Sequence, residues 1–231
     1  MAKVDLDIYR SKNEIFTNAF NSIVAKVCLK HEQEKFKTFL LTGCEPKVGT
    51  TTIATELAIA LSIAGWKTLL LDCDMRKMVK YKRLGDQVKA GLVDYVKGNA
   101  SLEEITYHTN WKMLDYISSG DIDEDDTLKV IYSNDFGKLF DKLKREYDYV
   151  IMDSPSVNSS VDPMILSVKA DASIIVCSLD GRNSKYLTKA RESLEEDGAN
   201  IIGVIQNKVE EENYKKYTKD YDYFINKHYV K

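Results

Sequence analysis

The sequence lacks the features that mark secreted, membrane-spanning or nucleic-acid-binding proteins. Its four cysteines show neither a CxxC pair nor metal-ligand spacing, which indicates a reduced protein with small buried thiols. No apolar run approaches the roughly 18 residues needed to cross a bilayer, and no signal peptide is recognisable. A net charge of −3 gives no reason to expect nucleic acid or an anionic membrane as the main partner. We therefore expect any membrane association to come through a partner, without direct insertion.

The sequence also contains only three prolines, no internal repeat and no Pro- or Ser-rich linker. Its 231 residues, 44% hydrophobic and 30% charged, suit one α/β domain with appendages. Continuous Ile, Val and Leu runs predict strands covered on both faces, in FKTFLLTG, KTLLLDCD, MLDYISSG, DYVIMDS, ASIIVCS and NIIGVIQNK. Helical patterns between them lie at Thr51–Gly65, Asp135–Tyr147, Asp162–Lys169 and Ser184–Gly198. This alternation predicts an α/β fold with a doubly wound, mostly parallel sheet and helices on both faces.

Two segments flank this predicted domain. Residues 1–35 carry a charged, amphipathic helical pattern, and residues 209–231 are polar and rich in tyrosine. We therefore expect an N-terminal helical extension at 1–35, a nucleotide-binding domain at 36–208 and a tyrosine-rich tail at 209–231. The acidic run Asp121–Asp126 is typical of a solvated loop.

The stretch LTGCEPKVGTTTIATELAIAL resembles a phosphate-binding loop in which one residue differs. An apolar strand leads into a turn with Pro46 and Gly49, and a Thr triplet then opens an apolar helix. A P-loop has lysine after that glycine, whereas this sequence has Thr50. Backbone N–H groups at a helix N-terminus can still bind phosphate without a side-chain charge.

Carboxylates follow two of the predicted strands. TLLLDCDMRK brings Asp72 and Asp74 to one strand end, with Arg76 two places on, and YVIMDSP brings Asp153 to another. Three carboxylates at apolar strand ends would repel each other unless a cation lies among them. Mg²⁺ bridging the phosphates of a nucleotide would account for them. Taken one at a time, each of these three aspartates could also be an ordinary acidic residue at the end of a strand.

Together these residues resemble a known family. GCEPKVGTTT, LLLDCDMR and VIMDSPS are similar to the Walker A, A′ and B motifs of bacterial tyrosine kinases of capsular and exopolysaccharide synthesis. GLVDYVKGNASLEEI, FGKLFDKLKREYDYVIMDSP and VDPMILSVKADASIIV also resemble family segments, so that the similarity covers roughly residues 10–231.

The resemblance implies a role for each of these residues. Asp74 and Thr51 would hold Mg²⁺, Asp72 would be the base on a tyrosine hydroxyl, and Asp153 would orient metal-bound water. ATP or ADP would be bound by Pro46, Lys47, Val48, Gly49, Thr50, Thr51, Thr52, Arg76 and Asn207, with Asn207 on the adenine. The phosphoacceptors would be Tyr214, Tyr217, Tyr221, Tyr223 and Tyr229. A C-terminal helix burying some of these tyrosines is the alternative.

Two departures from the family pattern bear on activity. Thr50 removes a charge that stabilises the transition state, and Lys47, which stands at a usual glycine, could compensate only in part. The ring-forming Glu-x-x-Arg-x-x-Arg motif is reduced to Glu14, Thr17 and Phe20, so self-association cannot use the usual ion pairs. The apolar stripe of Phe16, Phe20 and Ile23 favours docking on the protein's own domain.

The function expected from the resemblance is an ATP-dependent tyrosine autokinase that regulates polysaccharide synthesis and export. It would be cytoplasmic and recruited to the inner face of the membrane by a membrane-embedded polysaccharide co-polymerase that activates it. The first alternative is a catalytically weak or inactive nucleotide-binding scaffold for the same machinery. The second is a partitioning or septum-positioning ATPase, against which Glu45 argues, because those proteins have a lysine there.

Overall fold

Eight strands form a single sheet in the part of the chain that the structure describes. The computed structural model describes residues 2–6, 14–76, 88–121, 127–178, 184–210 and 212. The sheet order is β1-β4-β5-β3-β6-β2-β7-β8, and only β4 and β5 pair antiparallel. The strands are β1 (Lys3–Val4), β2 (Thr38–Gly43), β3 (Thr68–Asp72), β4 (Thr106–Thr109), β5 (Leu114–Ile117), β6 (Tyr149–Asp153), β7 (Ala172–Ser178) and β8 (Ile201–Asn207). The doubly wound, mostly parallel sheet predicted from the sequence is confirmed.

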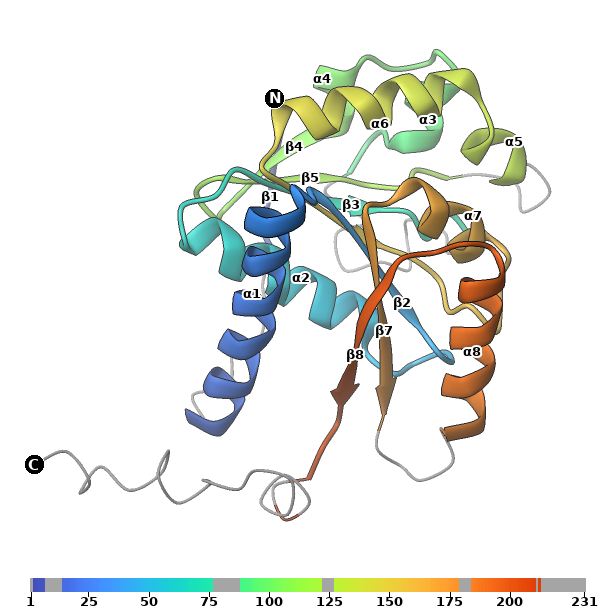
Figure 1. The fold of residues 1–231 in the computed structure, drawn as a ribbon. Helices are drawn as coiled ribbons and strands as arrows, with labels where there is room; N and C mark the ends of the chain where they lie inside the picture. Colours follow the sequence, from blue (N-terminus) through green and yellow to red (C-terminus); the bar gives the residue numbers. More distant parts are fainter. Residues whose placement is uncertain are drawn as a thin grey trace, which may run out of the picture.

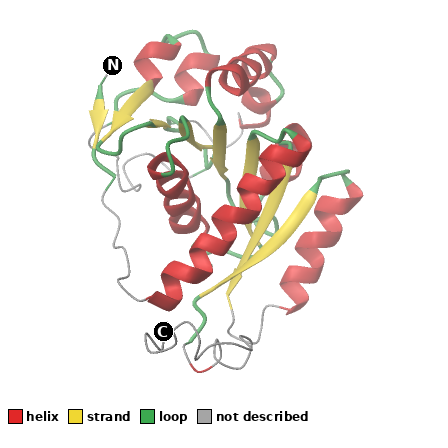
Figure 2. Cartoon of the chain, turned by 60° about the vertical axis from the view of Figure 1, so that its left-hand side comes forward, coloured by secondary structure: helices red, strands yellow, loops and turns green. Residues whose placement is uncertain are grey.

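Helices cover both faces of this sheet (Figure 1). One apolar cluster joins the strands to α1 (Glu14–Glu34), α2 (Thr50–Ile63) and α8 (Ser184–Glu196). The other joins them to α3 (Leu92–Val96), α5 (Thr127–Ile131), α6 (Asn134–Glu146) and α7 (Asp162–Lys169), with α4 (Leu102–Ile105) beside α3. Figure 2, turned by 60°, shows the strands between helices. Every residue of β2, β3, β6 and β7 is buried, which explains their uninterrupted apolar sequences.

The elements missed by sequence reasoning are all short. β1 has two residues, and β4 follows α4 directly, without a Gly or Pro between them to signal a boundary. α4 begins with a capping box in which Ser101 and Glu104 satisfy each other's backbone amides. Gly65 and Gly198, predicted to follow helix ends, both have left-handed φ values, 96° and 83°.

Helix α1 packs against its own chain, as the apolar stripe predicts. Phe20 is buried in the core and Ile23 packs against the same cluster, whereas Phe16 stacks on Phe20 and remains 38% exposed. The four cysteines are free, and three of them are buried, in agreement with the expectation from their spacing. No helix among the described residues is long and apolar enough to cross a membrane.

A partly buried carboxylate fixes the start of β2. Asp171, just before β7, accepts hydrogen bonds through Oδ2 from the amides of Lys37 and Thr38, at 2.8 and 2.9 Å. Its Oδ1 accepts from Lys144 Nζ of α6 at 2.6 Å. Burial raises the pKa of Asp171, but these donors outweigh it and leave the pKa below its ordinary value of 3.8. Asp171 thereby joins β2, β7 and α6 at the edge of the sheet opposite the strand ends that carry Asp72 and Asp153.

We predict that Asp171→Asn lowers the free energy of unfolding by about 1–3 kcal/mol at neutral pH, because a charged acceptor of three hydrogen bonds is lost. A carboxylate with a depressed folded-state pKa stabilises the fold above its unfolded pKa, and this contribution disappears as the pH falls through the folded pKa. The difference between the two proteins in urea unfolding should therefore shrink as the pH approaches 3. A difference that persists unchanged at acidic pH would contradict this role for the charge.

Candidate functional site

The loop between β2 and α2 has its carbonyl groups bonded from outside. Val157 N donates to Gly43 O at 3.0 Å, and Asn158 Nδ2 donates to Cys44 O at 2.6 Å. From the end of β8, Lys208 Nζ donates to Lys47 O at 2.7 Å and Asn207 Nδ2 donates to Val48 O at 2.8 Å. Because β2 is a central strand of the sheet, segments on both sides of it can reach the loop.

Cys44 N, at the start of the same loop, donates to Val176 O at 2.9 Å, but the amide groups that follow it have no such partners. Among the described residues, none of the N–H groups of Glu45 or of residues 47–52 donates a backbone or side-chain hydrogen bond. Lys47 and Gly49 have left-handed φ values of 67° and 96°, which curve the chain so that successive N–H groups can converge. These amides open a 14-residue helix, whose N-terminus favours an anion. The loop is therefore suited to bind phosphate.

Glycines at both ends of the loop allow close approaches. A Cβ on Gly49 would collide with Nδ2 of Asn207, so the Asn207 contact requires glycine there. A Cβ on Gly43 would lie 2.8 Å from Thr50 Oγ1, so the Thr50 hydroxyl is turned back toward the start of the loop. Lys47 adopts the left-handed conformation although it is not a glycine.

The predicted convergence of carboxylates is present for two of the three strand-end residues. Asp72 and Asp153 end β3 and β6, and they are register partners on these neighbouring strands. Asp153 is also close to β2, because β6 lies between β3 and β2. Their exposed fractions are only 7% and 5%. Two nearly buried carboxylates that face each other on neighbouring strands repel each other. A cation between or beside them would stabilise both in the charged form.

Asp74 and Tyr116 both donate hydrogen bonds to Asp72. Its Oδ1 accepts from the amide of Asp74 at 2.9 Å, and its Oδ2 accepts from the Tyr116 hydroxyl at 3.3 Å. Burial raises the pKa of Tyr116 well above its ordinary value of 10, and the nearby charge of Asp72 adds to this, so Tyr116 remains a donor. Sequence reasoning missed Tyr116, whose only signal was a polar hydroxyl within the apolar strand LDYI.

The predicted metal ligands are partly exposed. Asp74 is half-buried and Thr51 is exposed at the start of α2. Among the described residues, no three His, Cys, Asp or Glu side chains assemble into a metal-binding group. Mg²⁺ binds through one or two carboxylates together with substrate oxygens and water, so the residues present fit a nucleotide-bound Mg²⁺.

Arg76 is engaged by a buried carboxylate. Its Nε and Nη2 donate to both oxygens of Asp162, at 2.7 and 2.9 Å, and Nε also donates to Ser160 Oγ. Asp162 begins α7 and is fully buried. The pair anchors the segment that follows Asp74 to α7, and the nucleotide contact expected for Arg76 stays a prediction. The five candidate tyrosines of the tail lie outside the described residues.

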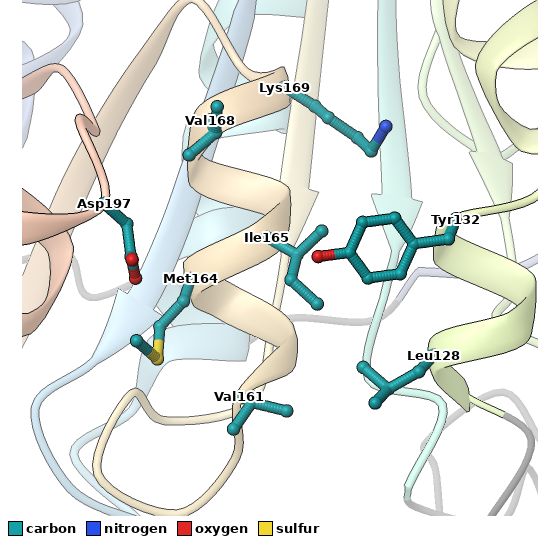
Figure 3. Close-up of a pocket in the computed structure, with 8 residues that line it drawn as sticks. All are labelled: Leu128, Tyr132, Val161, Met164, Ile165, Val168, Lys169 and Asp197. Atoms are coloured by element: carbon teal, nitrogen blue, oxygen red, sulfur yellow. The ribbon is translucent and has the colours of Figure 1, made fainter.

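An apolar hollow lies apart from this site, against α5 and α7. It has a volume of about 490 Å³ and is lined by Leu128, Tyr132, Val161, Met164, Ile165, Val168, Lys169 and Asp197. Figure 3 shows Tyr132 and Leu128 facing Ile165 from the neighbouring helix. Its lining offers one cation and no run of amides, so it does not match a triphosphate.

The arrangement of loop and carboxylates defines the P-loop class of nucleotide-binding proteins. The AAA domain family matches residues 45–196. The tyrosine-protein kinase CpsD of Streptococcus agalactiae serotype III is 33% identical over 195 residues, which cover 83% of this chain and 82% of that protein.

Solved structures agree with this result. The chimerical protein CapA2B2 is similar with a TM-score of 0.77 and 25% identity, over 90% of this chain and 94% of that one. The septum site-determining protein MinD of Pyrococcus horikoshii, solved with Mg-ADP, shares the fold alone, at 22% identity and a TM-score of 0.59, over 74% of this chain and 69% of that one. The chain belongs to the AAA domain family and, within it, to the bacterial tyrosine kinases that its motifs resemble.

We predict that Gly49→Ala destabilises the protein more than Gly65→Ala does. Both glycines have a φ of 96°, so both variants carry the cost of a left-handed alanine, about 1–2 kcal/mol. Only the Cβ at position 49 meets another group, Asn207, whereas position 65 faces open space. Urea unfolding of the two variants measures the extra cost, and equal losses would mean that Asn207 moves away without penalty.

Proposed function

We propose that this protein binds ATP with Mg²⁺ at the carboxyl ends of β2, β3 and β6 and phosphorylates tyrosines in its own tail or in that of a neighbouring copy. The observation that carries the proposal is the pairing of Asp72 with Asp153 beside a loop whose amides are open. Its similarity to proteins named tyrosine-protein kinases supports the same reaction. The product nucleotide would be ADP.

The residues present suit phosphoryl transfer. The open amides of the loop would hold the phosphate oxygens, and the carboxylate of Asp72 would accept the proton of an attacking tyrosine hydroxyl. Asp74 and Thr51 would hold Mg²⁺, which when bound neutralises charge on the phosphates, and Asp153 would orient its water. Asp74 N and Tyr116 keep Asp72 oriented.

The point at which β8 ends supports tyrosines of the tail as acceptors. β8 ends at Asn207, and the next residue, Lys208, bonds to the loop. The described chain thus reaches the proposed nucleotide site at Lys208, shortly before Tyr214 in the sequence. Phosphorylation would add strong negative charge there and change how the tail associates with other molecules.

The family resemblance further suggests where the protein acts. We infer a cytoplasmic protein that a membrane-embedded polysaccharide co-polymerase recruits to the inner face of the membrane and activates. Self-association would have to proceed without the arginines of the ring-forming motif, since Thr17 and Phe20 stand in that stretch and Phe20 is buried in the core.

One observation favours a second function. Thr50 replaces the loop lysine, and its hydroxyl is turned toward Gly43. A protein that binds nucleotide but transfers phosphate slowly would act as a nucleotide-dependent scaffold for the same machinery. Activity and binding must therefore be measured together.

We predict that the purified protein gains phosphotyrosine with ATP and Mg²⁺ and that Asp72→Asn lowers the rate about 100-fold or more, because the base is lost. Asp141→Asn, an exposed acid on α6, is the matched control and should behave as wild type. Phosphotyrosine is measured by mass spectrometry, and ADP binding by calorimetry. ADP binding without any phosphotyrosine would select the scaffold, and no binding at all would refute both functions.

Restoring a lysine at position 50 tests how much Thr50 lowers the phosphorylation rate. Thr50→Lys should raise the phosphorylation rate by about 100- to 1000-fold, because one well-placed donor to the transition state contributes roughly that factor. The measurement is the initial rate at saturating ATP. An unchanged rate would show that the missing lysine does not limit the reaction.

A further inference from the structure

We propose that Lys208, at the end of β8, supplies from outside the phosphate loop the positive charge that Thr50 does not provide. The proposal rests on the nucleotide binding proposed above. Lys208 Nζ lies 2.7 Å from Lys47 O, so an ammonium group is bound directly to the loop backbone.

The geometry of the peptide unit gives this contact its effect. The structure contains no cis peptide bond among the described residues, and in a trans peptide the C=O and N–H groups point in opposite directions. A donor on Lys47 O therefore lies opposite the N–H of Val48, which has no partner. A cation on the carbonyl polarises the peptide and makes that N–H a stronger donor to an anion.

Asn207 acts in the same way on the next peptide unit. Its Nδ2 donates to Val48 O, opposite the open N–H of Gly49. Asn207, the last residue of β8, and Lys208, which follows it, thus support two consecutive peptide units of the loop. We define Asn207 and Lys208, with the carbonyls they bind, as the β8 latch.

The backbone conformation of Lys208 also suits a residue that positions the loop. It has a left-handed φ of 56°, which turns the chain at the end of β8. Lys47, its partner, is left-handed as well, with a φ of 67°. The two hydrogen bonds of the β8 latch, one from an ammonium group and one from a side-chain amide, are partly exposed to solvent. We therefore expect each of them to change the affinity for nucleotide only moderately.

The first test uses the protein without nucleotide. In Lys208→Met the amide proton of Val48 should shift to lower frequency than in wild type in ¹H–¹⁵N spectra, because its peptide loses the cation. Lys208→Arg keeps a charged donor and should preserve most of the shift. Lys189→Met, an exposed lysine on α8, is the matched control and should leave the Val48 signal in place. An unchanged Val48 signal in Lys208→Met would overturn the proposal.

The second test is calorimetric titration with ADP and Mg²⁺. Lys208→Met should bind ADP about three- to tenfold more weakly, and Lys208→Arg should recover most of this loss. Lys47→Met removes the lysine within the loop itself and should weaken ADP binding less than Lys208→Met does. Equal affinity of Lys208→Met and wild type, or a larger loss in Lys47→Met, would refute the charge assigned to Lys208. If wild type binds no ADP, the proposed function fails, while the Val48 signal still decides the latch.

Discussion

The site depends on one loop in which backbone carbonyl groups are hydrogen-bonded and most of the amide groups are not. Between β2 and α2, carbonyls are hydrogen-bonded by groups near the end of β6, by the end of β8 and by the first turn of α2, whereas the amides of Glu45 and of residues 47–52 have no partner among the described residues. Backbone groups without partners are costly, so a row of such amides persists only where the fold holds the loop in place. The central position of β2 provides this hold, because segments from both sides reach the loop.

The charged side chains of the site are also separated, negative charge from positive charge. Asp72 and Asp153 bring negative charge to the ends of β3 and β6, next to the loop. The nearby cations are not directed at the centre: Arg76 is bound by Asp162, and Lys208 binds the outer side of the loop. Thr50 stands where a P-loop has lysine, so the loop lacks one positive charge. In the proposed nucleotide complex, the metal ion would therefore have to neutralise more of the negative charge.

The sequence predicted the fold class, six strands, the long helices and the apposition of Asp72 and Asp153, because these follow from apolar runs and from what stands at strand ends. It did not predict the contacts that shape the site. Asn207 and Val48 are 159 residues apart, and Tyr116 reaches Asp72 from a neighbouring strand. Such contacts depend on strand order and register, which periodicity does not encode. The left-handed backbone of Lys47 was also unforeseen, because residues other than glycine rarely adopt it.

The place of β8 in the sheet has a consequence for engineering this chain. β8 is the last strand in the order, pairs with β7 alone among the described strands, and leads directly into the tyrosine-rich segment. A shortened protein meant only to lack the proposed acceptor tyrosines must still keep Asn207 and Lys208. A chain that ended at Gln206 would lose the two side chains that bond to the loop together with the tyrosines, and a loss of activity would then be misread as a loss of substrate.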